Sequence, residues 1–184
     1  MGLFDNISNV KPTFDANYAQ AGEYVVQIES IRQDRSRKKV DFVATRVSIL
    51  HVLKAEKDEA GQSVSHRVGE ETTYMISDTS TAHDMFLPNV KAEIMQITLF
   101  PEHEVTAQAC EDLVDPVTQP LAGIVCIMTA VMMETKGTKR PYTKVTFDGD
   151  ITRKFCTDLG VVLPADAQFV PEMRAAATDA AATA

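Results

Sequence analysis

The order of hydrophobic periodicities along the chain is the feature that most constrains its fold. Apolar and polar side chains alternate, with the period of half-buried β-strands, over about residues 22–32, 39–52, 72–77, 123–134 and 142–147. Between the third and fourth of these segments the period lengthens to that of a helix, with Val90, Ile94 and Ile97 on one face. The sequence therefore predicts a mainly β protein with five strands and a helix between strands 3 and 4.

Capping signals bound the helical region. Thr81 is expected to be the N-cap of the helix with Asp84 three residues later, and Pro88 suits a first helical turn. A second short helix is expected over residues 106–114, where a following Asp-Pro pair stops it.

This order of elements is that of an OB-fold, a five-stranded barrel whose loops between strands 1 and 2 and strands 4 and 5 flank the oligonucleotide-binding face. We therefore expect a five-stranded OB-fold-like barrel in residues 21–160, between an irregular N-terminal arm (1–20) and a flexible Ala-rich tail (161–184). The two binding loops then fall at residues 33–38 and 135–141. A β-sandwich and other small barrels are alternatives that share the same pattern.

Basic residues are concentrated at these two loops, although the net charge of the chain is −8. Residues 32–46 (the first basic segment) and residues 136–154 (the second basic segment) each carry six Lys or Arg against two acidic residues. Salt screens charges beyond about 8–10 Å, so local fields rather than net charge attract a ligand at short range. The two segments can therefore attract a polyanion to an otherwise acidic protein.

Binding of single strands needs cations for phosphates and flat rings for unstacked bases. The candidate cations are Arg35, Arg37, Lys38, Lys39, Arg46, Lys136, Lys139, Arg140 and Lys144. Strand alternation that places Val43 in the core turns Phe42 and Arg46 outward. The same alternation on the fifth strand turns Tyr142 and Lys144 outward. The alternatives are that the loop charges only keep the hairpins solvated, that the rings pack, and that Arg46 pairs with a carboxylate of a neighbouring strand.

The residue types that usually carry catalysis or bind metals form no known motif in this sequence. Cys110, Cys126 and Cys156 are widely spaced and include no Cys-x-x-Cys, so we expect three reduced, mostly buried thiols. The four histidines lack His-x-x-x-His or His-Glu-x-x-His spacing, and neither a complete phosphate loop nor Gly-x-Ser-x-Gly is present. We expect no metal site, no cofactor and no enzymatic activity.

The chain carries no signal for a membrane. No apolar run approaches the roughly 18 residues of a membrane span, and the first residues contain neither a basic region nor an apolar signal core. The expected location is the cytoplasm, with no membrane partner.

Five stretches of the chain resemble phage-encoded single-stranded-DNA-binding proteins, in which a Gly-Glu/Gln-Tyr strand opens the barrel. They are residues 21–24 (AGEY), 35–42 (RSRKKVDF), 88–91 (PNVK), 119–123 (QPLAG) and 136–144 (KGTKRPYTK), and together they cover roughly residues 20–150. The resemblance implies an OB-fold that protects single strands during DNA replication or recombination in the host-cell cytoplasm, with replication or recombination proteins as candidate partners. Bacterial single-strand binders often end in an acidic tail with a terminal Phe, whereas this chain ends in Ala-Ala-Thr-Ala, which puts recruitment through such a tail in doubt.

The sequence thus predicts a non-enzymatic protein that binds single-stranded DNA with little sequence preference. The alternative from another class is a structural or assembly protein, such as a virion component, whose basic hairpins contact other subunits. A third reading is an accessory module that binds an acidic protein. The choice between DNA and RNA and the existence of a homo-oligomer stay open, because the sequence marks neither a 2′-hydroxyl contact nor a self-complementary surface.

Overall fold

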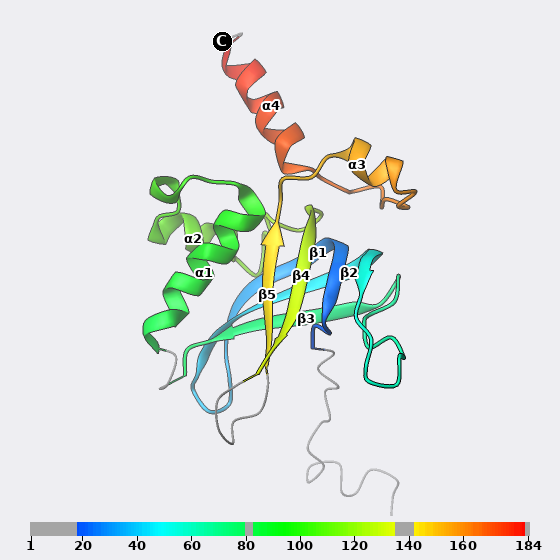
Figure 1. Ribbon diagram of the computed structural model, residues 1–184. Coiled ribbons are helices and arrows are strands. Elements are labelled where there is room, and N and C mark those ends of the chain that lie inside the picture. Colours follow the sequence, from blue (N-terminus) through cyan, green and yellow to red (C-terminus); the bar gives the residue numbers. More distant parts are fainter. Residues whose placement is uncertain (1–17, 80–82, 135–141, 183–184) are drawn as a thin grey trace, which may run out of the picture.

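One antiparallel sheet organises the protein, whose computed structural model describes residues 18–79, 83–134 and 142–182 (Figure 1). Its strands are β1 (Gly22–Arg35), β2 (Asp41–Ala55), β3 (Glu71–Ser77), β4 (Val125–Met133) and β5 (Tyr142–Asp148), in the spatial order β3-β2-β1-β4-β5. The predictions of a mainly β protein and of five strands are confirmed, and each strand lies within about three residues of its predicted bounds.

The helices occupy the connections and the C-terminal part of the chain. They are α1 (His83–Thr98), the short 3-10 helix η2 (Glu102–Glu104), α2 (Ala107–Leu113), α3 (Arg153–Asp158) and α4 (Val170–Ala182). The helix between strands 3 and 4 is confirmed as α1, but Pro88 lies in its interior and not in its first turn, so that prediction was wrong. The Thr81 cap lies outside the described residues. The second short helix is confirmed as α2, where Thr106 Oγ1 accepts a hydrogen bond from Ala109 N at 3.2 Å.

The sheet stays open where a barrel would close. Among the described residues β3 and β5 form no ladder with each other, and α1 packs against both of these edge strands instead. The backbone N–H of Phe147 on β5 donates to Gln96 Oε1 of α1 at 3.0 Å, and Gly149 N donates to the Gln96 carbonyl at 2.8 Å. The C-terminal half of α1 therefore supplies hydrogen-bond partners that a neighbouring strand would supply in a closed barrel.

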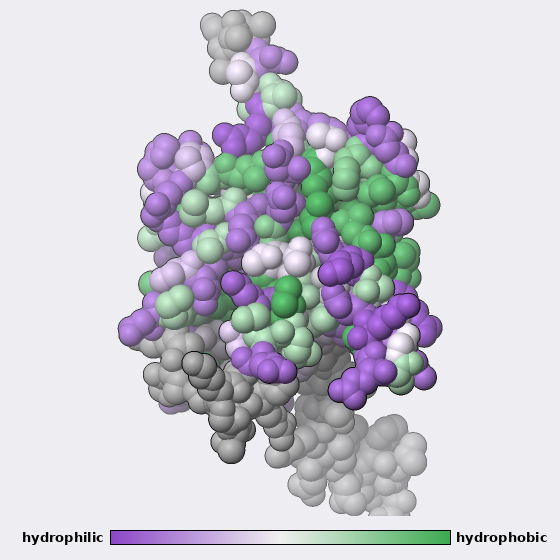
Figure 2. Space-filling view, viewed as in Figure 1, coloured by the Kyte–Doolittle hydropathy of each residue, from purple (hydrophilic) through white to green (hydrophobic). Residues whose placement is uncertain are grey.

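Two hydrophobic clusters lie on opposite faces of the sheet. The larger cluster fills the space between the sheet and α1, and its largest buried side chains include Tyr24, Ile28, Ile49, Ile94, Ile97 and Met128. The smaller one joins Val25 and Val125 to Ile151, Cys156 and Phe169 from the segment around α3. Hydrophobic residues gather at the surface on this side of the molecule, near α3 (Figure 2).

The packed part of the chain extends beyond residue 160. Gln168 N donates to the Gly123 carbonyl at 2.8 Å, Val125 N donates to the Gln168 carbonyl at 2.9 Å, and Phe169 is buried. The expected Ala-rich tail, residues 161–184, therefore includes a docked portion followed by α4, which projects from the body (Figure 1).

The three cysteines agree with the expectation of reduced, mostly buried thiols. Cys126 and Cys156 are buried, Cys110 is half-buried, and all three are free thiols. No helix in the described ranges is both long and apolar enough to cross a membrane.

Replacement of Gly149 by Ala is predicted to be strongly destabilising. A Cβ at this position would lie 2.1 Å from the carbonyl oxygen of Ile97, a backbone atom that no side-chain rotation can move away. We expect a loss of about 3 kcal/mol in the free energy of unfolding, measured by urea denaturation. Gly61→Ala is the control: Gly61 has a φ of 78° but no atom near its Cβ position, so only backbone strain of about 1 kcal/mol is expected. Equal losses in the two variants would contradict the close approach of α1 to β5.

Candidate nucleic-acid interface

The turn between β1 and β2 presents three exposed cations. Ser36 N donates to the Val40 carbonyl and Lys39 N donates to the Ser36 carbonyl, both at 2.8 Å, which closes a tight turn with Lys39 in the left-handed region at a φ of 61°. Arg37, Lys38 and Lys39 are exposed, and no ion pair is seen for them within the described residues. We call these three residues the hairpin tip.

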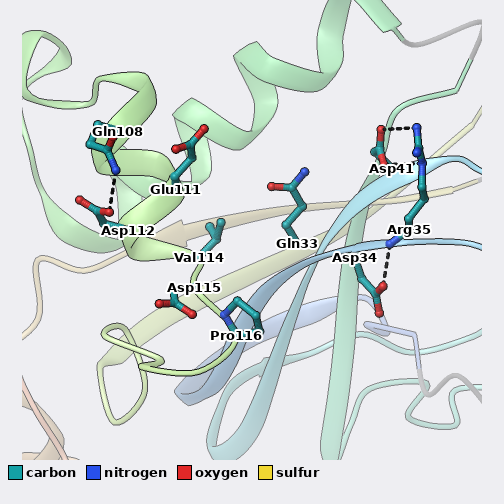
Figure 3. Close-up of a pocket in the computed structure, with 10 residues that line it drawn as sticks. All are labelled: Gln33, Asp34, Arg35, Asp41, Gln108, Glu111, Asp112, Val114, Asp115 and Pro116. Carbon is teal, nitrogen blue, oxygen red and sulfur yellow. Dashed lines mark hydrogen bonds and ion pairs between the residues drawn. The ribbon is translucent and has the colours of Figure 1, made fainter.

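Arg35, at the base of the same hairpin, is neutralised by its own neighbour. Its guanidinium Nε lies 3.0 Å from Oδ1 of Asp41, its partner in the register of β1 and β2. A hollow of about 510 Å³ opens beside this pair, between the hairpin and α2 (Figure 3). The acidic residues that line it are Asp34, Asp41, Glu111, Asp112 and Asp115. These carboxylates disfavour a phosphate on this side of the hairpin, and the exposed cations left in the first basic segment are the hairpin tip and Arg32.

Arg46 is also engaged in an ion pair. Its guanidinium contacts the Glu71 carboxylate on β3, with Nε donating to Oε2 at 3.1 Å. The alternative that Arg46 pairs with a carboxylate of a neighbouring strand is therefore confirmed. Phe42 lies on the same outer face of β2, opposite Ser77 of β3, and is half-buried. Phe42 therefore offers only part of its ring to a ligand.

The fifth strand carries the most accessible ring among the predicted site residues. Tyr142, at the start of β5, has 53% of its surface exposed, and Lys144 two residues later is also exposed. The outward direction predicted for this pair agrees with the buried positions of Val145 and Phe147. The remaining predicted cations of the second basic segment, Lys136, Lys139 and Arg140, lie outside the described residues.

A groove of about 670 Å³ lies where β3, β5 and α1 meet, and we call it the seam groove. Its lining includes Tyr74, Met75 and Ile76 of β3, Met85, Asn89, Ala92, Glu93 and Gln96 of α1, Met133 of β4, and Tyr142 to Thr146 of β5. The groove is therefore lined by two tyrosine rings, three methionines and a few polar groups, with Lys144 as the cation among its described residues.

Glu93 is the unexpected residue of this groove. It is only 6% exposed, one of its oxygens accepts a hydrogen bond from the Thr45 hydroxyl, and Oε2 is buried with no hydrogen-bond partner among the described residues. Burial raises the pKa of Glu93 to about 7, although the Thr45 hydroxyl lowers it in part. Burial, with the nearby Glu93 and Tyr142, likewise raises the pKa of Tyr74 to about 12.

Sequence reasoning missed Glu93, Tyr74 and the groove methionines. Glu93 had a detectable signal, because it stands three residues after Val90 and four before Ile97, on the apolar face of the expected helix. Tyr74 and the methionines become neighbours only when β3, β4 and α1 are brought together.

No protein-family model matches the chain, and no curated protein shows a significant match. In the described ranges no group of three or more His, Cys, Asp or Glu side chains is placed to hold a metal ion.

The raised pKa of Glu93 predicts a stability that falls with rising pH. An unfolded Glu ionises near pH 4.5, whereas folded Glu93 ionises near pH 7, so between these values the folded chain binds more protons and loses stability as they leave. The full loss, above pH 7, is about 3 kcal/mol. Glu93→Gln removes this loss, so its free energy of unfolding relative to the wild type should increase from pH 5 to pH 8 in urea denaturation.

The matched control is Glu59→Gln, which changes an exposed carboxylate in the loop before β3. Its difference from the wild type should be small at both pH values. A gap between Glu93→Gln and the wild type that is the same at pH 5 and pH 8 would show that Glu93 titrates normally.

Proposed function

We propose that this protein is an OB-type barrel, open between β3 and β5, that binds single-stranded DNA with little sequence preference. The order β3-β2-β1-β4-β5, with α1 inserted between β3 and β4, supports the OB-type assignment. The ligand would gain affinity from phosphates at the hairpin tip and from bases stacked on exposed rings.

The observation that carries this proposal is a series of exposed cations and at least partly exposed rings, which we call the strip. It starts at the hairpin tip and passes the half-buried Phe42 on β2. Two residues further along β2, Ala44 lies opposite Met75 of β3, which lines the seam groove. The strip ends at the exposed Tyr142 and Lys144 across this groove. An extended single strand can use all three parts, because its backbone seeks cations while its unpaired bases seek flat apolar surfaces.

Titration of oligo-dT by fluorescence anisotropy tests the proposal directly. The affinity should fall linearly on a log–log plot against salt, with a slope of about −0.7 for each phosphate neutralised. Reversal of Arg37, Lys38 and Lys39 to Glu should weaken binding about tenfold or more, because three attractive charges become repulsive. Its melting temperature should hardly change, because exposed charges contribute little to folding.

The control reverses Lys57 and Arg67, two exposed cations outside both basic segments. Equal weakening by this pair would place the ligand elsewhere on the protein. No binding at low salt by the wild type would eliminate the single-strand hypothesis and favour the assembly role, in which basic hairpins contact other subunits.

A second prediction concerns Tyr142. The protein has no Trp and only four tyrosines, so its emission in the near ultraviolet comes from tyrosine alone. If a base stacks on Tyr142, DNA should quench part of this emission, and Tyr142→Phe should bind normally with less quenching. Tyr142→Ala should lose about 1–3 kcal/mol of binding free energy at an unchanged melting temperature, since the ring is largely exposed.

Tyr18→Phe serves as the control for this measurement. Tyr18 is 60% exposed but does not line the seam groove, so its loss should leave the quenched component intact. Unaltered affinity of Tyr142→Ala would remove Tyr142 from the interface.

A further inference from the structure

The seam groove combines the features that bind a flat heteroaromatic ring. Its volume of about 670 Å³ lies within the range of small-molecule sites, about 300–1,000 Å³. Tyr74 and Tyr142 contribute rings, and Met75 and Met133 contribute polarisable apolar surface. Lys144, also in the lining, supplies a cation beside the rings.

The second observation is the buried carboxyl group of Glu93. Its Oε1 accepts from Thr45, but Oε2 has no partner among the described residues, a state that costs free energy and is rare in folded proteins. A ligand that donates a hydrogen bond to Oε2 would recover this cost. The methionines of the same lining are unbranched and have several rotatable bonds, so the groove can adapt its shape to a ligand.

We propose that the seam groove takes one unstacked nucleobase of a bound single strand and that Glu93 accepts a hydrogen bond from its exocyclic amino group. This proposal rests on the proposed function, because the rest of the strand must already be bound along the hairpin tip. Cytosine, adenine and guanine carry an exocyclic amino group, whereas thymine does not. The protein therefore adds selection at one position to otherwise sequence-tolerant binding.

An apolar peptide fits the same groove less well. A helix or strand that covers the methionines with aliphatic side chains would leave the buried Oε2 of Glu93 without a donor. A nucleobase presents ring faces to Tyr74 and Tyr142 and a donor at its edge, so it satisfies both the apolar and the polar part of the lining.

The test compares oligo-dC with oligo-dT of equal length, since both are pyrimidine strands and only cytosine has the amino group. Because burial raises the pKa of Glu93 to about 7, the titration is run at pH 8, where the carboxylate accepts and cannot donate. We expect the wild type to bind oligo-dC about fivefold more tightly than oligo-dT, the effect of one typical hydrogen bond. In Glu93→Leu, which keeps a similar size but has no acceptor, the ratio should fall to about one, while Glu59→Leu should keep the wild-type ratio.

The outcomes separate this inference from the proposed function. Equal affinity of the wild type for both strands overturns the base-reading role of the groove and leaves single-strand binding standing. Binding of neither strand overturns both. A preference that persists in folded Glu93→Leu, with folding checked by its melting temperature, shows that another group reads the amino group. The wild-type comparison decides the question even if the variant fails to fold.

Discussion

Unpaired backbone groups at the two edges of the sheet are the constraint on which the rest of the structure depends. Among the described residues one edge of β3 and one edge of β5 have no neighbouring strand, and the backbone groups there must find other partners. Gln96 accepts two such backbone N–H groups at the β5 edge: its side chain accepts from Phe147, and its carbonyl accepts from Gly149 just after the strand. At the other edge, residue 18 forms an isolated bridge with Thr73 of β3. The edges are thus covered by a helix and by a short extended segment.

The use of a helix to span the opening explains the mixed chemistry of the seam groove. A helix approaches closely only where no side chain intervenes, which Gly149 permits beside the Ile97 carbonyl. Elsewhere α1 stands away from the strands, and the space between them becomes the groove lined by Tyr74 and Tyr142. The inward face of α1 brings the Glu93 carboxyl group to the Thr45 hydroxyl. If β3 and β5 were instead joined by a ladder, no helix residue would lie between them. The same packing therefore closes the core and creates a recess with an unsatisfied acceptor.

The sequence was sufficient to predict the five strands, α1 and α2, because each has a local signature, whereas α3 and α4 were not predicted. The five strands follow from alternation, and α2 follows from the Thr106 cap and the Asp-Pro stop. The position of Pro88 was misread, because the first-turn preference of Pro is statistical and the packing of α1 on the sheet stabilises a helix that begins earlier. That the sheet stays open between β3 and β5 could not be predicted, since this depends on how α1 fits between two strands that are distant in sequence.

The candidate site was less predictable because strand register decides which charged side chains pair with one another. Arg35 and Asp41 are six residues apart, and Arg46 and Glu71 are 25 apart, yet each pair is in contact once the strands align. A count of basic residues along the chain includes these cations, whereas the folded surface presents them already neutralised. Cation spacing within a turn is local, so the hairpin tip was the part of the first basic segment that sequence reasoning could identify.

This distribution of charge also limits what kind of ligand the surface can hold. The hairpin tip is basic, but the hollow at the base of the same hairpin is lined by five carboxylates, so a uniformly negative surface such as a duplex backbone would meet repulsion beside attraction (Figure 3). A flexible strand can follow the tip and turn away from the carboxylates towards Tyr142 and Lys144. Flexibility and exposed bases are properties of single strands, and they match a surface on which cations are few and rings and methionines lie close to them. The arrangement of charge, more than its amount, therefore favours the proposed single strand over a duplex.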